Sequence, residues 1–212
     1  MIRLHGYWRS GAAYRVRIGL ALKGVAYEQV HHDLRTGAQR ADDYARLNPQ
    51  RLVPTLEAGD LVLTQSVAIL EWLDECHPQP PLLPGDPNGR AIVRSMAATI
   101  ASDTHPLHNL RVLNALRKEF GANDTAVQRW IAHWLGDGLA AVDRLVERHG
   151  DGFAYGDRPT LADCCIVPAL YAARRFAVDL TRFPALVDAG ERAMALPEIA
   201  AAHPDRQPDA DR

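Results

Sequence analysis

The distribution of prolines is the feature that most constrains the fold of this chain. Residues 77–89 contain five prolines and two glycines, and the hydrophobic pattern differs on the two sides of that segment. Before it, strand-like runs alternate with helical ones, whereas after it the apolar spacing is helical only. We therefore predict an α/β domain over residues 1–78, a linker over 79–88 and an all-helical domain over 89–212.

The first domain is predicted to contain its elements in the order βαβ followed by αββα. Its first helix is capped by Ser10 and ends before Gly24; it is apolar on two sides, so it should be covered on both. The strand candidates are Ile2–His5, Tyr27–His31, a strand entered from Leu52–Leu56 and its hairpin partner Leu61–Leu63. The other predicted helices are Ala41–Leu47 and Ser66–Leu73, and Ser66 is the expected cap of the second. This order is that of a small α/β domain.

The second domain is predicted to consist of helices. Apolar residues on helical spacing begin at Ile92, and Pro106 should kink the long helix that they mark. Thr160 and Asp163 have capping-box spacing ahead of an apolar run that ends at Phe176. Further helices are expected over residues 127–145 and 184–196, and the polar tail over 203–212 is expected to be irregular.

Composition and charge exclude several classes of protein. The net charge of −2 gives no electrostatic basis for binding nucleic acid or an anionic membrane. No apolar run approaches the ~18 residues that a membrane-spanning helix needs, and the N-terminus lacks the apolar region of a signal peptide. With three cysteines, two of them adjacent at 164 and 165, reduced core thiols are expected rather than disulfides. We therefore expect a cytoplasmic protein.

The basic residues are almost all arginine, with 22 arginines against two lysines. The base composition of the genome is one explanation. The other is that some arginines bind planar anions, because the guanidinium group matches a carboxylate in a bidentate geometry. Both explanations can hold at once, so each arginine must be judged by its position.

Several short motifs, spread over essentially the whole chain, match one known pattern. They are Tyr7-Trp8-Arg9-Ser10, Arg15–Gly24, Asn48-Pro49 with Val53–Leu56, Gln65-Ser66, His105–Leu113 and His203–Asp209. Together they resemble the zeta class of the glutathione transferases, which contains the maleylacetoacetate and maleylpyruvate isomerases. The resemblance implies an N-terminal thioredoxin-like domain that binds glutathione, followed by a C-terminal helical-bundle domain that holds the substrate.

The sequence departs from the zeta pattern at one place. Where that pattern reads Ser-Cys after Arg9-Ser10, this chain has Gly11-Ala12. A mechanism that needs that cysteine or second hydroxyl is excluded, so Ser10 carries the only side-chain hydroxyl at this turn. The backbone N–H groups of Gly11 and Ala12 remain as donors.

The resemblance implies that Ser10 activates the thiol of reduced glutathione, with Gly11 beside it. A thiol is a weak nucleophile until it ionises, and its free pKa is about 8.5. A hydroxyl that donates a hydrogen bond to the thiolate and a helix N-terminus with free N–H groups both favour the ionised form. The alternative for Ser10 is a plain N-cap.

Further glutathione contacts are implied in the same way. Gln65 and Ser66 open a helix and would bind the γ-glutamyl carboxylate, with Gln50 as an additional contact. A cis bond between Val53 and Pro54 would turn the backbone of Val53 towards glutathione. The alternatives are simple capping by Ser66 and an ordinary proline at the entry to a strand.

The helical domain supplies candidates for both ligands. His105 and Asn109 are expected near glutathione, and the alternative for His105 is a wall of the substrate pocket. A second histidine follows His105 at metal-like spacing, but no third ligand lies nearby in sequence, so no metal is expected. Arg9, Arg111 and Arg175 are candidates for binding substrate carboxylates, and Arg9 and Arg175 are assigned to catalysis. Arg175 could instead be a solvated residue at a helix end.

The implied reaction converts maleylpyruvate, a dicarboxylate keto acid, to fumarylpyruvate in gentisate breakdown. Thiolate addition would make the cis double bond single, rotation would follow, and loss of the thiolate would leave the trans isomer and regenerate glutathione. The alternatives are maleylacetoacetate from tyrosine and homogentisate breakdown, a detoxifying glutathione transferase or peroxidase, and a non-catalytic binding protein. A homodimer is expected, with the helix at 66–73 contacting the partner's helix at 92–100.

Overall fold

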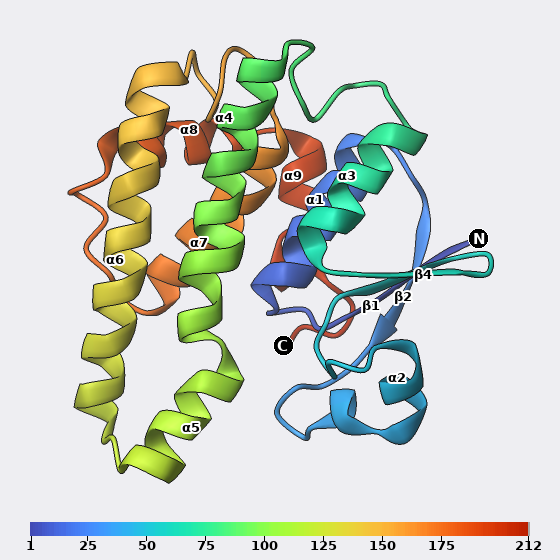
Figure 1. Cartoon of the computed structure of the whole chain (residues 1–212), viewed down its shortest axis with the longest axis vertical. Helices are drawn as coiled ribbons and strands as arrows, with labels where there is room; N and C mark the ends of the chain where they lie inside the picture. The colour runs from blue at the N-terminus through green and yellow to red at the C-terminus, as the bar shows by residue number, and fades with distance from the viewer. Residues whose placement is uncertain (212) are drawn as a thin grey trace. The chain divides into compact units, whose positions relative to one another are not determined.

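The structure, a computed structural model, describes residues 1–211 and divides into two compact units (Figure 1). One unit comprises Met1–Leu82 together with the segment that begins at Ala195, and the other comprises Leu83–Met194. The predicted domains instead assigned every residue after the linker to the helical half. The segment from Ala195 groups with the first unit because its helix, α9 (Pro197–Ala201), packs against α1 (Gly11–Leu22).

The first unit is built on a mixed four-stranded sheet with the strand order β2-β1-β3-β4. β1 (Ile2–Gly6) pairs in parallel with β2 (Tyr27–His31), and α1 makes the crossover between them. β3 (Thr55–Ala58) runs antiparallel to β1, and β4 (Leu61–Thr64) completes the hairpin at the edge of the sheet. The predicted strands of this domain are therefore confirmed.

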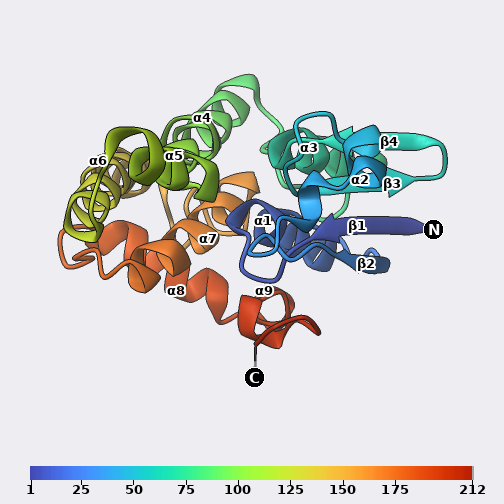
Figure 2. The ribbon, with the colours of Figure 1, turned by 90° about the horizontal axis from the view of Figure 1, so that it is seen from below.

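Helices α1 and α3 (Ser66–Cys76) supply the apolar residues that cover this sheet, and α2 (Asp42–Leu47) follows β2 as predicted. The core of the unit consists of the buried side chains Leu4, Val16, Leu20, Leu56, Ile69 and Leu73. Gly19 lets α1 and α3 approach closely, because a Cβ at that position would lie 2.2 Å from Leu70 Cδ2. Since α1 also packs against α9 (Figure 2), it is covered by two helices.

The start of α3 differs from the prediction. Ser66 is the first helical residue rather than the N-cap, and Gln65 occupies the cap position without a side-chain capping bond. The hydroxyl of Ser66 instead accepts a hydrogen bond from the guanidinium group of Arg15 at 3.1 Å. The side chain of Ser66 is thus engaged by α1, a contact that the local sequence pattern does not encode.

The second unit contains α4 (Pro87–Ala98), α5 (Leu110–Phe120), α6 (Asp124–His149), α7 (Leu161–Arg175) and α8 (Pro184–Met194). Pro106 was expected to kink one long helix; it lies instead in a separate 3₁₀ turn over His105–His108. A π-type turn over Thr99–Thr104 precedes it, and Asn109 then caps a new helix, α5. The helix is interrupted rather than kinked because a proline supplies no N–H and restricts the residue before it.

The start of α7 confirms two predictions. Thr160 and Asp163 form the expected capping box: the Thr160 side chain accepts the backbone N–H of Asp163, and the Asp163 side chain accepts the backbone N–H of Thr160. Cys164 and Cys165 are fully buried in this helix, as expected of core thiols. Within residues 1–211, none of the helices combines the length and the apolar character needed to cross a membrane.

Candidate active site

A tight turn between β1 and α1 presents Ser10. The N–H of Ser10 donates to the carbonyl of Tyr7 at 2.9 Å, which closes a four-residue turn. Ser10 then caps α1, and its Oγ accepts the N–H of Ala13 at 3.2 Å. Because Oγ is the acceptor in that bond, the hydroxyl proton stays available to donate to a ligand. The expected N-cap is confirmed, and it is compatible with a second role.

The electrostatics of this helix end favour a bound anion. The N–H groups of Gly11 and Ala12 belong to the first turn of α1 and have no intrahelical acceptor. That turn contains no acidic side chain, and the guanidinium group of Arg9 lies over the Trp8 ring, 5.1 Å from its centroid. A thiolate placed beside Ser10 would therefore meet a hydroxyl donor and the positive end of a helix.

The N-terminus of α3 brings three predicted site residues together. Gln65 Nε2 donates to Gln50 Oε1 at 2.7 Å, although the two residues lie far apart in sequence. Gln65 has a positive φ of 67°, which is unfavourable for a residue with a side chain, and it leads directly into Ser66. Because no side chain caps α3, the N–H groups of its first turn can receive a carboxylate.

The loop before β3 contains the cis bond that the resemblance implied, between Val53 and Pro54. The β3 ladder begins at Thr55, so the backbone of Val53 lies outside it. Two buried residues hold this loop: Tyr44 Oη and Asn48 Nδ2 both donate to the carbonyl of Leu52, at 2.6 and 2.7 Å. The sequence did not predict this support, because Asn48 stood out only as part of a motif and Tyr44 belonged to none.

Within the second unit, a row of rings connects His105 with Arg175. The rings of His105 and His108 meet edge to face at 5.2 Å, and His108 meets Phe176 at 6.0 Å. The guanidinium group of Arg175 lies over the Phe176 ring, 4.7 Å from its centroid. Arg175 is exposed at the end of α7, so its cationic group can reach a ligand.

The other two candidates of the second unit lie at the start of α5. Asn109 caps this helix, and its Oδ1 accepts the N–H of Val112 at 3.2 Å, which leaves the amide nitrogen as its donor. Arg111 is exposed in the first turn of α5.

Comparison with known proteins identifies similar sequences along nearly the whole chain. The family described as glutathione S-transferase, N-terminal domain, matches residues 1–75, and the corresponding C-terminal domain family matches residues 112–202. The chain is 44% identical over 210 residues to a maleylpyruvate isomerase from Ralstonia sp., covering 98% of this chain and 99% of that protein. It is 48% identical over 213 residues to a maleylacetoacetate isomerase from Pseudomonas aeruginosa, covering 98% of each.

Solved structures show the same fold. A holo maleylpyruvate isomerase, described as a bacterial glutathione transferase of the zeta class, matches with a TM-score of 0.96 and 43% identity. The match covers 99% of this chain and 100% of that one. A maleylacetoacetate isomerase from Anaeromyxobacter dehalogenans with bound glutathione matches with a TM-score of 0.90 and 46% identity, covering 100% of this chain and 98% of that one.

Proposed function

This chain belongs to the glutathione transferase family, and from that premise we propose that it is a glutathione-dependent cis–trans isomerase of maleyl keto acids. The observation that carries the proposal is the geometry of Ser10, which caps α1 through its oxygen and keeps its proton for a ligand. Relatives named for this activity match over essentially the full length of both chains.

The residues of the first unit fit glutathione. Ser10 and the N–H of Gly11 hold the sulfur as a thiolate at the N-terminus of α1. The backbone of Val53, next to the cis Pro54, binds the peptide part of the molecule. The uncapped N–H groups at the start of α3, with Gln65, Ser66 and Gln50, bind the γ-glutamyl carboxylate, and single variants of these residues can test each contact.

Glutathione, when bound, supplies a nucleophilic thiolate whose reversible addition converts the substrate double bond into a single bond that can rotate. Arg9 and Arg175 bind the substrate carboxylates and meet the negative charge that develops on the substrate oxygen. Arg111 is a further candidate ligand for a carboxylate, and His105 and Asn109 keep the glutathione contacts that the resemblance implies. No general base is required, because the attacking sulfur is also the leaving group.

Within this class we propose maleylpyruvate as the substrate, with maleylacetoacetate as the second candidate. Relatives named for the two substrates match at similar identity, 44% and 48%, so identity does not separate them. Overall likeness to the bacterial maleylpyruvate isomerase, including the replacement of the family's Ser-Cys by Gly11-Ala12, supports maleylpyruvate. We also propose a homodimer, which light scattering on the purified protein would test.

The experiment follows the ultraviolet spectrum of each maleyl keto acid with the protein, with and without glutathione. We expect fast conversion to the fumaryl isomer that needs glutathione but leaves its concentration unchanged, and the faster substrate identifies the pathway. Ser10→Ala should lower kcat/KM at least about tenfold, because it removes a donor to the thiolate. Ser95→Ala, which removes an exposed serine of α4, is the matched control.

Two outcomes would contradict the proposal. If neither substrate is isomerised, the isomerase assignment fails, and a screen of electrophiles and peroxides would test the detoxifying alternative. If glutathione is consumed in proportion to product, the protein is a conjugating transferase instead.

A further inference from the structure

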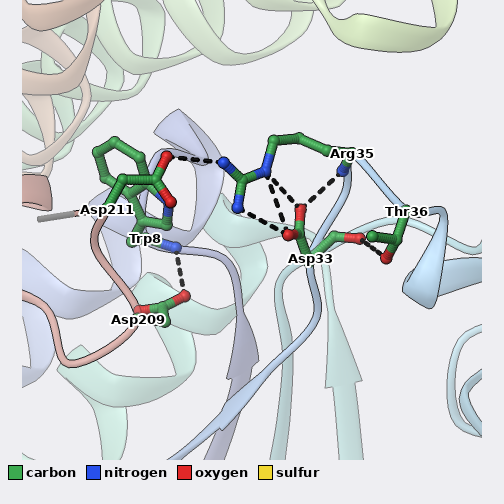
Figure 3. A network of polar contacts seen from close by, with 6 residues as sticks. All are labelled: Trp8, Asp33, Arg35, Thr36, Asp209 and Asp211. Carbon is green, nitrogen blue, oxygen red and sulfur yellow. Dashed lines mark hydrogen bonds and ion pairs between the residues drawn. The ribbon is translucent and has the colours of Figure 1, made fainter.

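Both backbone polar groups of Trp8 are held by contacts that lead to the C-terminal segment, and Figure 3 shows the one made by its N–H. The N–H of Trp8 donates to Asp209 Oδ2 at 2.9 Å. The carbonyl of Trp8 accepts from Arg17 Nη2 at 2.9 Å, and Arg17 Nε donates to the carbonyl of Ala202 at 3.1 Å. Trp8 lies within the turn that the hydrogen bond from Ser10 to Tyr7 closes. Residues outside this turn, Asp209 and Arg17, therefore hold the N–H and the carbonyl of Trp8.

Asp209 is itself held in a defined position. Its side chain is only 14% exposed, and its second oxygen, Oδ1, accepts from Gln29 Nε2 at 3.3 Å and lies 3.2 Å from His31 Nδ1. Both of these partners are on β2. The single carboxylate therefore connects the C-terminal segment, the sheet and the turn that precedes α1.

A second acidic residue anchors the same segment two residues further on. Asp211 Oδ2 accepts from Arg35 Nη1 at 2.7 Å, and the same guanidinium group binds the carboxylate of Asp33 at 2.8 Å (Figure 3). The hydrogen bonds from Arg35 lower the pKa of Asp33, so this carboxylate stays ionised. The tail is thus attached at Asp209 to the turn and at Asp211 to the loop after β2.

We propose that Asp209 is a positioning residue for the thiol site: by fixing the Trp8 N–H it sets the direction of Ser10 Oγ and of the first N–H groups of α1. This rests on the proposed function of Ser10. Trp8 is buried, so its N–H would be left without an acceptor if the carboxylate were removed, and the turn would have to move to find another. A small displacement of a group that stabilises a charge is enough to weaken that stabilisation.

The test measures the pKa of the glutathione thiol when it is bound to the protein, from the ultraviolet absorbance of the thiolate as a function of pH. Asp209→Ala should raise this pKa by about one pH unit, which lowers the thiolate population by about tenfold at pH values well below the pKa. The dissociation constant of glutathione, measured by calorimetry, should change less than about threefold, because the other contacts remain.

Two further variants separate positioning from a general loss of structure. Asp209→Asn keeps an oxygen that can accept the Trp8 N–H, so it should restore the pKa of the bound thiol to the wild-type value. Asp205→Ala is the matched control, because it removes the same charge from the same segment at a residue that is exposed. An unchanged thiol pKa in Asp209→Ala, or an equal change in Asp205→Ala, would overturn the proposal.

Ser10→Ala in the same titration distinguishes this inference from the proposed function. If Ser10→Ala leaves the pKa of the bound thiol unchanged, the role of Ser10 fails; if it raises that pKa while Asp209→Ala does not, only the positioning role fails. The double variant Ser10→Ala/Asp209→Ala should raise the pKa of the bound thiol by less than the sum of the two single shifts. Should circular dichroism show that Asp209→Ala is unfolded, Asp209→Glu, which displaces the carboxylate by one methylene, takes its place with the same expectation.

Discussion

Lys23 Nζ lies 2.6 Å from Asp74 Oδ1, and the lysine side chain is completely buried. The same ammonium group donates to the carbonyls of His77 and Pro80 at 2.6 and 2.5 Å. One of the two lysines of the chain therefore fastens the end of α1 to the end of α3 and to the proline-rich segment that follows.

Lys23→Met should lower the free energy of unfolding by about 3–5 kcal/mol, because it leaves a largely buried carboxylate and two carbonyls without their cation. Urea unfolding followed by circular dichroism measures this. Lys118→Met, at the exposed second lysine, should change the free energy of unfolding by less than about 0.5 kcal/mol. Equal effects of the two substitutions would contradict the structural role of Lys23.

Gln65→Gly should stabilise the fold and weaken glutathione binding. Glycine adopts the positive φ of this position without strain, so the free energy of unfolding should rise by about 1 kcal/mol. The loss of the side chain should raise the dissociation constant of glutathione by about tenfold. Ala177→Gly is the matched control: its φ is 52°, so it should also gain stability, with glutathione binding unchanged.

Arg175→Gln should lower kcat/KM for the maleyl keto acid by about 10- to 100-fold, which is the size of one charge-assisted hydrogen bond. The affinity for glutathione should not change. Its neighbour Arg174 forms an ion pair with Glu191 at 3.1 Å, so Arg174→Gln should leave kcat/KM within about twofold of wild type. Similar losses in both variants would show that Arg175 acts through the charge of the helix end.

The stability of the protein should fall in mild acid because of His32. Burial, with smaller contributions from the charges of His5 and His31, lowers the pKa of His32 to about 4. The unfolded chain, in which a histidine has a pKa of about 6.5, therefore takes up this proton first. The contribution is complete above that pH and is lost as the pH falls towards 4.

His32→Gln should therefore show a flatter dependence of the unfolding free energy on pH between 6.5 and 4 than the wild type. Chemical unfolding at several pH values gives the two slopes, which are compared instead of the absolute stabilities. His133→Gln, at an exposed histidine, should keep the wild-type slope. A His32→Gln slope equal to that of the wild type would assign the acid sensitivity to other groups.

Local features of the fold could be read from the sequence, and contacts between distant residues could not. The strand Tyr27–His31 and the Ser10 cap were predictable, because alternation and capping depend on neighbouring residues. The prediction that Ser66 caps α3 was wrong because its hydroxyl accepts a hydrogen bond from Arg15, a residue of α1 that is distant in sequence. The support that Tyr44 gives to the cis loop was invisible for the same reason.

The tail shows this limit most clearly. It was expected to be irregular, and apart from a short 3₁₀ turn over Pro204–Arg206 its described part is. Irregular backbone is nevertheless compatible with fixed position, because Asp209 is held by hydrogen bonds to Trp8 and Gln29. Secondary structure can be estimated from residue patterns, whereas the partners of a polar side chain depend on the tertiary fold.

The first unit is discontinuous in sequence, since Met1–Leu82 is completed by the segment from Ala195. During translation, the sheet and α1 leave the ribosome while α9 and Asp209 are still unmade, and the whole helical unit must be synthesised before they arrive. The packing of α9 against α1 is therefore completed late, and the nascent N-terminal part exposes the face of α1 that α9 later covers. The order of synthesis therefore places the whole helical unit ahead of the residues that complete the first unit.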